Sequence, residues 1–223
     1  MTAFDWQPLL LSVKLATLST GILLPMLILL AWWISRGGPW KVAVRAFLTL
    51  PMVLPPTVMG FYLLTLLSPS NWLGSFLERH FDLRLVFSFS GMLIATVFVS
   101  VPFLLNPLLA GFESLPRNLT EAARVLGKSR WIILWRVQLP NMIPSILTAC
   151  VLAFAHAMGE FGVILMIGGK IPGKTLVASM AVYDLVETMD YSGALRYSLV
   201  LSGAAFAVLA TVTYLERRSR RIS

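Results

Sequence analysis

Long apolar runs separated by short polar stretches dominate the pattern of this chain. Five runs are long enough to cross the roughly 30 Å hydrocarbon core of a bilayer, which takes about 20 helical residues. They are residues 10–34, 44–67, 85–110, 145–167 and 195–215. The pattern therefore predicts an all-α membrane protein with five transmembrane helices, organised as a single transmembrane domain over residues 1–223.

The second and third runs contain helix-breaking residues. The second carries Pro51, Pro55 and Pro56, and the third carries Pro102 and Pro107. Each proline removes a backbone donor and kinks a helix. In lipid the freed carbonyls need partners, so broken helix belongs inside a bundle or beside an aqueous path. Two interpretations of these kinks remain open: they serve helix packing, or they line a pore.

The longest polar interruption covers residues 121–140, where apolar residues recur at spacings near three and four. This periodicity indicates an amphipathic helix. Thr120 is placed to cap its first turn, and Glu121 would lie at the positive end of the helix dipole. Gly127 costs a helix about 1 kcal/mol relative to Ala, so it marks a bend or a close approach. Pro140 is expected to end the helix.

Charge gives the chain an orientation. With 57% hydrophobic residues and 13% charged residues, the composition is not that of a soluble domain. Twelve of the eighteen Lys and Arg lie around the first-to-second connection, in the third-to-fourth connection and after the fifth run. The positive-inside rule then places the N-terminus outside and the C-terminus and residues 121–140 in the cytoplasm. A net charge of +8 with this distribution does not indicate nucleic-acid binding.

Residues 121–140 resemble the EAA loop of ABC importer permeases. The matching positions, with Val137 replacing the family's Ile, are Glu121, Ala122, Ala123, Gly127, Leu139 and Pro140. The resemblance implies the type I ABC importer permease fold and makes these residues a cytoplasmic coupling helix that enters a cleft of a separate ATP-binding subunit. An ordinary amphipathic loop of an unrelated membrane protein is the alternative, but it would not need the full spacing.

The fourth run contains His156 and Glu160, four residues apart and therefore expected on one helix face. An ionisable residue inside a membrane span is a functional candidate. A hydrogen-bonded pair that fixes helix packing explains the same pattern. The motif Gly-Glu-Phe-Gly at residues 159–162 and the Leu-Pro-rich second run resemble permeases of the molybdate, tungstate and sulfate group, in which Arg is common at the position of His156.

No Lys or Arg lies deep in the five runs, so we expect a translocation path that holds a doubly charged anion weakly, with hydroxyls and backbone amides. Selectivity would then come from a binding protein. The polar side chains at suitable depth are Thr57, Thr96, Ser100, Asn106, Ser145 and Thr148.

Residues 168–175 satisfy the P-loop expression G-x-x-x-x-G-K-T. A working P-loop follows a strand and precedes a helix. This segment instead follows a predicted membrane span and lies on the outer side. We therefore expect an accidental match, and a lysine-bearing turn that helps receive a binding protein or an anion.

Together these features favour the permease subunit of an ATP-driven importer for a tetrahedral oxyanion, with molybdate as first choice and tungstate or sulfate as alternatives. The resemblance implies a bacterial inner-membrane assembly of two permease copies, two ATP-binding cassette subunits holding ATP and magnesium, and an extracytoplasmic oxyanion-binding protein. This chain is expected to be no enzyme and to hold no cofactor or metal. An ATP-independent secondary anion transporter or channel would suit the broken helices and the intramembrane carboxylate, but it leaves the EAA pattern unexplained.

Overall fold

The computed structural model describes residues 4–220, with side chains described through residue 211. This part of the chain is helical and contains no strand. Its helices are α1 (Gln7–Ile34), α2 (Pro39–Thr49), a 3-10 turn (Leu50–Met52), α3 (Pro56–Leu67), α4 (Trp72–Phe81), α5 (Phe89–Ser114), α6 (Arg117–Val125), α7 (Arg130–Ile133), a π turn (Leu134–Gln138), α8 (Leu139–Asn141), α9 (Ile143–Gly159), α10 (Gly162–Gly168), α11 (Ala178–Glu187) and α12 (Tyr191–Arg220).

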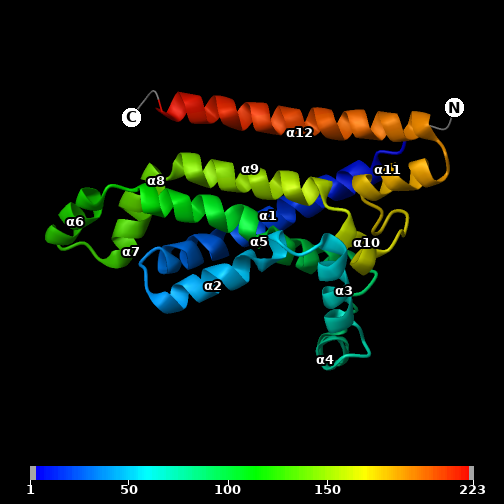
Figure 1. The fold of residues 1–223 in the computed structure, drawn as a ribbon, viewed down its shortest axis with the longest axis horizontal. Coiled ribbons are helices and arrows are strands. Elements are labelled where there is room, and N and C mark those ends of the chain that lie inside the picture. The colour runs from blue at the N-terminus through cyan, green and yellow to red at the C-terminus, as the bar shows by residue number, and fades with distance from the viewer. Residues whose placement is uncertain (1–3, 221–223) are drawn as a thin grey trace.

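The bundle is built around α5, which packs between α1 and α9 (Figure 1). Four leucines of α5 are fully enclosed: Leu104, Leu105, Leu108 and Leu109. They share one apolar cluster with Leu23 and Leu27 of α1 and Ala149 of α9. Its contacts with both α1 and α9 place α5 at the centre of the bundle.

The second apolar run is broken, as its prolines predict. Helix α2 ends at Thr49, and α3 begins at Pro56. The segments before and after the break differ in direction by 105°. Pro56 occupies the first turn of α3, where a missing N–H costs nothing. Figure 1 shows α3 and α4 projecting away from the axis of the bundle as a result.

The fourth run is also broken, which the sequence does not predict. Helix α9 ends at Gly159, and α10 begins at Gly162. The expectation that His156 and Glu160 share a face of one helix is therefore wrong, because Glu160 has an extended backbone with ψ 129°. Its carboxylate accepts the Val163 N–H at 3.0 Å and so caps the new helix instead of continuing the old one.

By length and composition, α1, α5 and the Tyr191–Thr211 part of α12 are each able to cross a membrane. The count rises to as many as five if two bent pairs each form one span. These pairs are Pro39–Met52 with Pro56–Leu67, and Arg130–Asn141 with Ile143–Gly159, the second bent by 75°. The number of spans stays a prediction.

Helix α12 lies along α9 and α11, and its end near Arg220 lies at the same end of the bundle as α6 (Figure 1). Much of its outer surface is apolar and exposed, including Leu195, Leu199 and Phe206. The arginines that contribute to the orientation argument fall outside the described part: Arg217, Arg218 and Arg220 lie beyond the described side chains, and Arg221 beyond the described residues.

Candidate functional site

The stretch predicted as one amphipathic helix forms two helical segments on either side of Gly127. Helix α6 ends at Val125, and Gly127 has a φ of +70°. The Gly127 N–H donates to the Arg124 carbonyl at 2.9 Å, and the Lys128 N–H donates to the Ala123 carbonyl at 3.1 Å. These two bonds form a Schellman motif, in which the left-handed residue is usually glycine. Gly127 therefore makes a tight turn.

Helix α6 begins at Arg117, directly after Pro116. Pro116 cannot continue the preceding helix, and its φ suits the start of a new one. The sequence-based cap at Thr120 is therefore wrong, since Thr120 lies inside α6. Glu121 lies in the second turn, so its expected place at the positive end of the helix dipole is also wrong.

Pro140 lies next to the end of this helical segment, as expected, because the segment ends at Asn141 and a 75° bend separates it from α9. It lies in the first turn of α8, and α9 begins at Ile143 shortly after it. The preceding segment, Leu134–Gln138, is a π turn in which the Leu139 N–H donates to the Leu134 carbonyl five residues earlier. A proline in a first turn removes no needed donor, so the helix runs one residue past Pro140 before the bend.

The stretch of residues 121–140, named the coupling stretch here for its resemblance to the EAA loop, is anchored at one end and exposed at the other. Leu134 and Leu139 are buried in the apolar cluster formed by α1 and α5. At the tip of α6, by contrast, Val125 is 88% exposed and Leu126 is 74% exposed. The predicted single apolar face is thus divided, because a glycine turn separates a half that packs on the bundle from a half that projects from it.

A second site surrounds the break between α9 and α10. Here a cavity of about 150 Å³ is lined by Pro51, Met52, Leu54, Pro56, Met59, Val99, Phe103, His156, Glu160 and Val163. The Nε2 atom of His156 lies 3.5 Å from a carboxylate oxygen of Glu160. The imidazole stacks on the Phe103 ring, with centroids 3.8 Å apart. The pair therefore joins α9, α10 and α5 at the edge of the cavity.

Two glycines allow α10 to pack directly on α3, and sequence reasoning assigns neither of them this role. A Cβ on Gly162 would lie 2.9 Å from the Pro56 Cβ, and one on Gly60 would lie 2.9 Å from the Met166 Cβ. Such close approach is available only to glycine. The second glycine of the Gly-Glu-Phe-Gly motif, Gly162, is the sequence signal that marks this contact.

The six expected path residues do not line this cavity. Thr96 and Ser100 are enclosed on α5, with hydroxyls that have no partner in the described part of the chain. Thr57 is exposed in the first turn of α3, and Asn106 is half-buried. Ser145 lies against Gly111, and the Thr148 hydroxyl donates to the Pro144 carbonyl at 3.0 Å. The path assignment stays a prediction.

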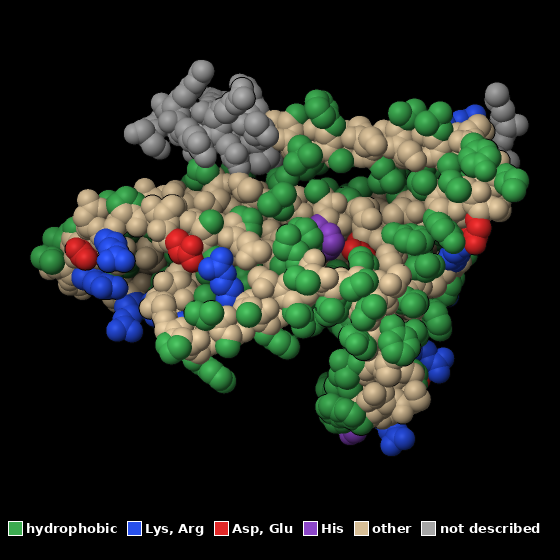
Figure 2. Space-filling view, in the orientation of Figure 1, with side chains coloured by type: hydrophobic (Ala, Val, Ile, Leu, Met, Phe, Trp, Pro, Cys, Tyr) green, Lys and Arg blue, Asp and Glu red, His purple; other side chains and the backbone are tan. Residues whose placement is uncertain are grey.

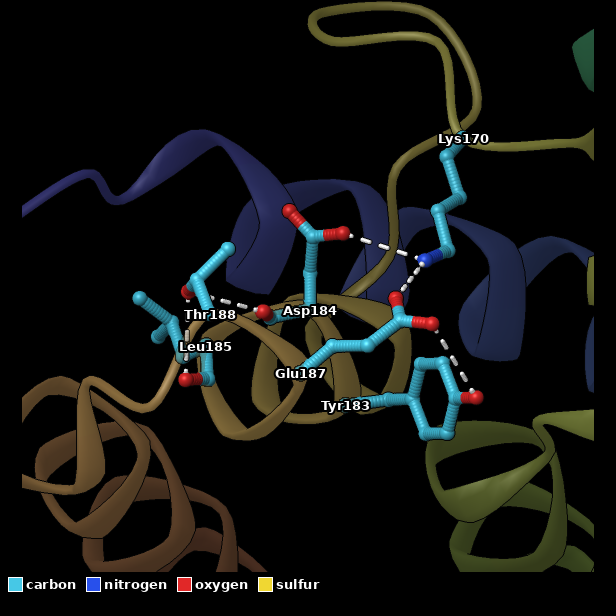
Figure 3. A network of polar contacts seen from close by, with 6 residues as sticks. All are labelled: Lys170, Tyr183, Asp184, Leu185, Glu187 and Thr188. Atoms are coloured by element: carbon cyan, nitrogen blue, oxygen red, sulfur yellow. Dashed lines mark hydrogen bonds and ion pairs between the residues drawn. The ribbon is translucent and has the colours of Figure 1, made fainter.

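The segment with the P-loop expression lacks the setting of a P-loop. It follows helix α10, not a strand, and helix α11 begins only at Ala178. Figure 3 shows the Lys170 ammonium between two carboxylates, 2.7 Å from Glu187 and 3.1 Å from Asp184. These hydrogen bonds raise the pKa of Lys170, and the bond to Glu187 has the larger effect. The positive charge of Lys170 is thus compensated by two carboxylates, whereas Lys174 is exposed to solvent.

Across the described residues, no group of three or more His, Cys, Asp or Glu side chains is arranged to hold a metal ion.

Comparison with known proteins shows what the chain resembles. Residues 21–221 match the family described as binding-protein-dependent transport system inner membrane component. The chain is 40% identical, over 87% of its length and 86% of the relative's, to the molybdenum transport system permease protein ModB of Azotobacter vinelandii. It is 34% identical, over 96% of its length and 76% of the relative's, to the probable sulfate transport system permease protein cysT of Zygnema circumcarinatum.

The fold has a counterpart among solved structures. The chain superposes with a TM-score of 0.79, at 22% identity, on a chain of a bacterial alginate ABC transporter in complex with its alginate pentasaccharide-bound periplasmic protein. The match covers 98% of this chain and 80% of the other. At this identity the likeness concerns the fold, and it confirms the expected arrangement of membrane helices.

Proposed function

We propose that this chain, which belongs to the family of binding-protein-dependent transport system inner membrane components, is the permease of an ATP-driven importer. In this proposal the importer carries molybdate into the cytoplasm. The fold of the chain is the type I ABC importer permease fold, and the chain is a permease subunit of such an importer. The observation that carries the choice of molybdate is the 40% identity to a molybdenum permease over 87% of the chain. Sulfate is the nearest alternative, supported by the relative at 34% identity, and tungstate is a further one.

The coupling stretch supports a role for a separate ATPase. Helix α6 and the Gly127 turn lie at one end of the molecule, and Figure 2 shows Lys and Arg side chains gathered over α6 and α7. Exposed Val125 and Leu126 form an apolar tip inside this basic surface. Apolar side chains that enter a pocket and are ringed by polar contacts are the usual anchors of a protein interface. The tip is therefore suited to a cleft in a partner.

Two permease copies form the transport unit in this proposal. The exposed apolar residues of α12 and α3 give each copy surface to bury against lipid or against a second copy. Two ATP-binding cassette subunits hold ATP and magnesium and bind the two coupling stretches. An extracytoplasmic oxyanion-binding protein delivers the anion, and this chain contributes no nucleotide site and no catalysis.

The chain is an integral membrane protein of the bacterial inner membrane. In our proposal its N-terminus is outside and its C-terminus is cytoplasmic. The arrangement of helices supports this, because α1 begins at the end of the bundle opposite α6, and α12 ends at the same end as α6 (Figure 1). The basic residues of the coupling stretch then face the cytoplasm, as the positive-inside rule requires.

Reconstitution tests the proposed function. The permease is placed in proteoliposomes with the ATPase and binding protein of its importer, and ATP hydrolysis and uptake of radiolabelled molybdate are measured together. We expect uptake only when ATP and all components are present, with tungstate competing strongly and sulfate weakly. Uptake that persists without the ATPase would instead identify an ATP-independent transporter, and stronger competition by sulfate would identify a sulfate importer.

A further inference from the structure

A small cavity lies where the end of α1 meets the coupling stretch. Its volume is about 60 Å³, and its lining contains three arginines and no carboxylate: Trp32, Ser35, Arg36, Thr120, Arg124, Arg130, Ile133 and Gln138. These residues come from the end of α1, from α6 and from the segment after the Gly127 turn. The cavity thus joins both halves of the coupling stretch to the bundle.

Within the described part of the chain, no carboxylate lies in the wall of this cavity beside its three arginines. None of Arg36, Arg124 and Arg130 forms an ion pair with a carboxylate among the described side chains. Burial lowers the pKa of Arg36, and the nearby charges of Arg130 and Arg124 lower it further. A larger neighbouring cavity of about 400 Å³ shares Arg36 and Arg124 with this one and is also lined by Glu113 and Glu121. Glu113 pairs with Arg45 at 3.2 Å, and Glu121 forms no ion pair with another side chain of residues 4–211.

Arg36 is held in place before any ligand binds. The Arg36 guanidinium lies over the Trp32 ring, 3.5 Å from its centroid, and Trp32 packs against Trp131 of α7 with centroids 5.1 Å apart. A guanidinium stacked on a ring keeps its N–H edge free to donate.

The lining also contains uncharged polar groups, one of which lacks a hydrogen-bond partner in the described part of the chain. The Gln138 Oε1 atom is buried without a hydrogen-bond partner among the described residues. A rotated Gln138 amide would present two N–H donors at the same place. The Thr120 hydroxyl adds a further donor to the wall.

We propose that this arginine cavity binds a dianionic tetrahedral oxyanion. Three guanidinium groups offer charge-assisted, fork-shaped donors that match the oxygens of such an ion, and its double negative charge would offset their mutual repulsion. The same chemistry has two sources in an ATP-driven importer, namely the transported oxyanion after its release and the phosphate that ATP hydrolysis produces.

A bound anion would brace the coupling stretch. It would connect Arg36 at the end of α1 with Arg124 of α6 and Arg130 of α7, on opposite sides of the Gly127 turn. This consequence rests on the proposed function, because it requires that the stretch transmits motion of an ATPase. Accumulated oxyanion on the coupling side would then slow further transport. The binding site itself requires no such assumption.

Titration of the purified permease tests the site without any partner. The protein is placed in nanodiscs of uncharged phosphatidylcholine and titrated calorimetrically, at low ionic strength, with molybdate, sulfate and phosphate in separate experiments. Arg36→Gln and Arg124→Gln remove one charge each from the cavity. Arg136→Gln removes one charge from the same stretch but outside the cavity, and serves as the matched control.

We expect saturable binding in the wild type, at least tenfold weaker binding in both cavity variants, and a change of less than twofold in the control. Arg36→Lys, which keeps the charge and loses the fork, should fall between the wild type and Arg36→Gln. The anion that binds more tightly identifies the source. Absence of saturable binding, or equal weakening by Arg136→Gln, would overturn the proposal.

A second measurement separates this site from the transport function. In the reconstituted complex, the same anion added on the ATPase side should reduce ATP hydrolysis in the wild type and leave the Arg36→Gln complex unaffected. Failure of ATP-driven uptake with intact anion binding would count against the proposed function alone. If Arg36→Gln abolishes assembly with the ATPase and the isolated permease binds no anion, the arginines serve the partner subunit and the oxyanion proposal is wrong.

Discussion

The carboxylate of Glu160 lies 3.5 Å from the Nε2 atom of His156, although the helix that carries His156 has already ended at Gly159. The second carboxylate oxygen accepts the Val163 N–H at 3.0 Å, and the Glu160 carbonyl accepts the Ser179 hydroxyl at 2.7 Å. One residue therefore ends a helix, caps the next one and contacts a third. This makes Glu160 a structural junction at the edge of a cavity.

Substitution of Glu160 should alter stability and gating more than anion choice. Glu160→Gln retains an oxygen for the Val163 N–H, whereas Glu160→Ala loses the cap, which is typically worth about 1 kcal/mol. We expect the melting temperature to fall by roughly 2–4 °C in Glu160→Ala and by less in Glu160→Gln. Thermal unfolding in detergent measures this. A changed preference between molybdate and sulfate in Glu160→Gln would show instead that the carboxylate faces the path.

Gly127 should tolerate substitution only by residues that accept a left-handed backbone. Its φ is +70°, and a Cβ there would meet no atom within 4 Å, so the cost is conformational and not steric. For most residues it amounts to about 1–2 kcal/mol. We expect Gly127→Val to reduce coupled ATP hydrolysis strongly while membrane insertion stays normal, and Gly127→Asn to retain most activity. Equal activity of the two variants would argue against the turn as the coupling element.

Gly162→Ala should open the contact between α10 and α3. The added methyl would lie 2.9 Å from the Pro56 Cβ and 3.3 Å from the Thr57 backbone nitrogen, which cannot move aside independently. Overpacking of this kind costs about 1–3 kcal/mol. The matched control is Gly21→Ala in α1, where nothing lies within 4 Å. Unfolding temperatures should fall only for Gly162→Ala, and equal values for the two variants would contradict the close packing.

Reporter fusions test the orientation. Reporters placed after Gly38 and after Ser223 should be cytoplasmic, and those after Trp72 and Lys174 should be external. Alkaline phosphatase is active only outside, so paired fusions with a cytoplasmic reporter distinguish the sides. Ser223 lies outside the described residues, so its expected side rests on the sequence alone. Inversion at any one of these sites would refute the orientation.

Local sequence patterns were sufficient for the class of protein and for the polar helical stretch at residues 121–140 that we propose couples to an ATPase. Run length and hydropathy are properties of neighbouring residues, so they indicate membrane helices without tertiary information. Pro51, Pro55 and Pro56 break the second run through their own covalent structure, whatever surrounds them. The need for glycine at the turn is likewise local, since the φ of +70° at Gly127 is a property of one residue.

Only the tertiary structure decided where the fourth run breaks and what the breaks bring together. Residues 159–162 lie inside a long apolar run, and the helix stops there where the Glu160 carboxylate accepts the Val163 N–H of α10 and contacts His156. The arginine cavity depends on packing in the same way. Arg36 lies far from Arg124 and Arg130 in the sequence, and the three meet because Trp32 packs against Trp131, a contact between distant segments that no local pattern records.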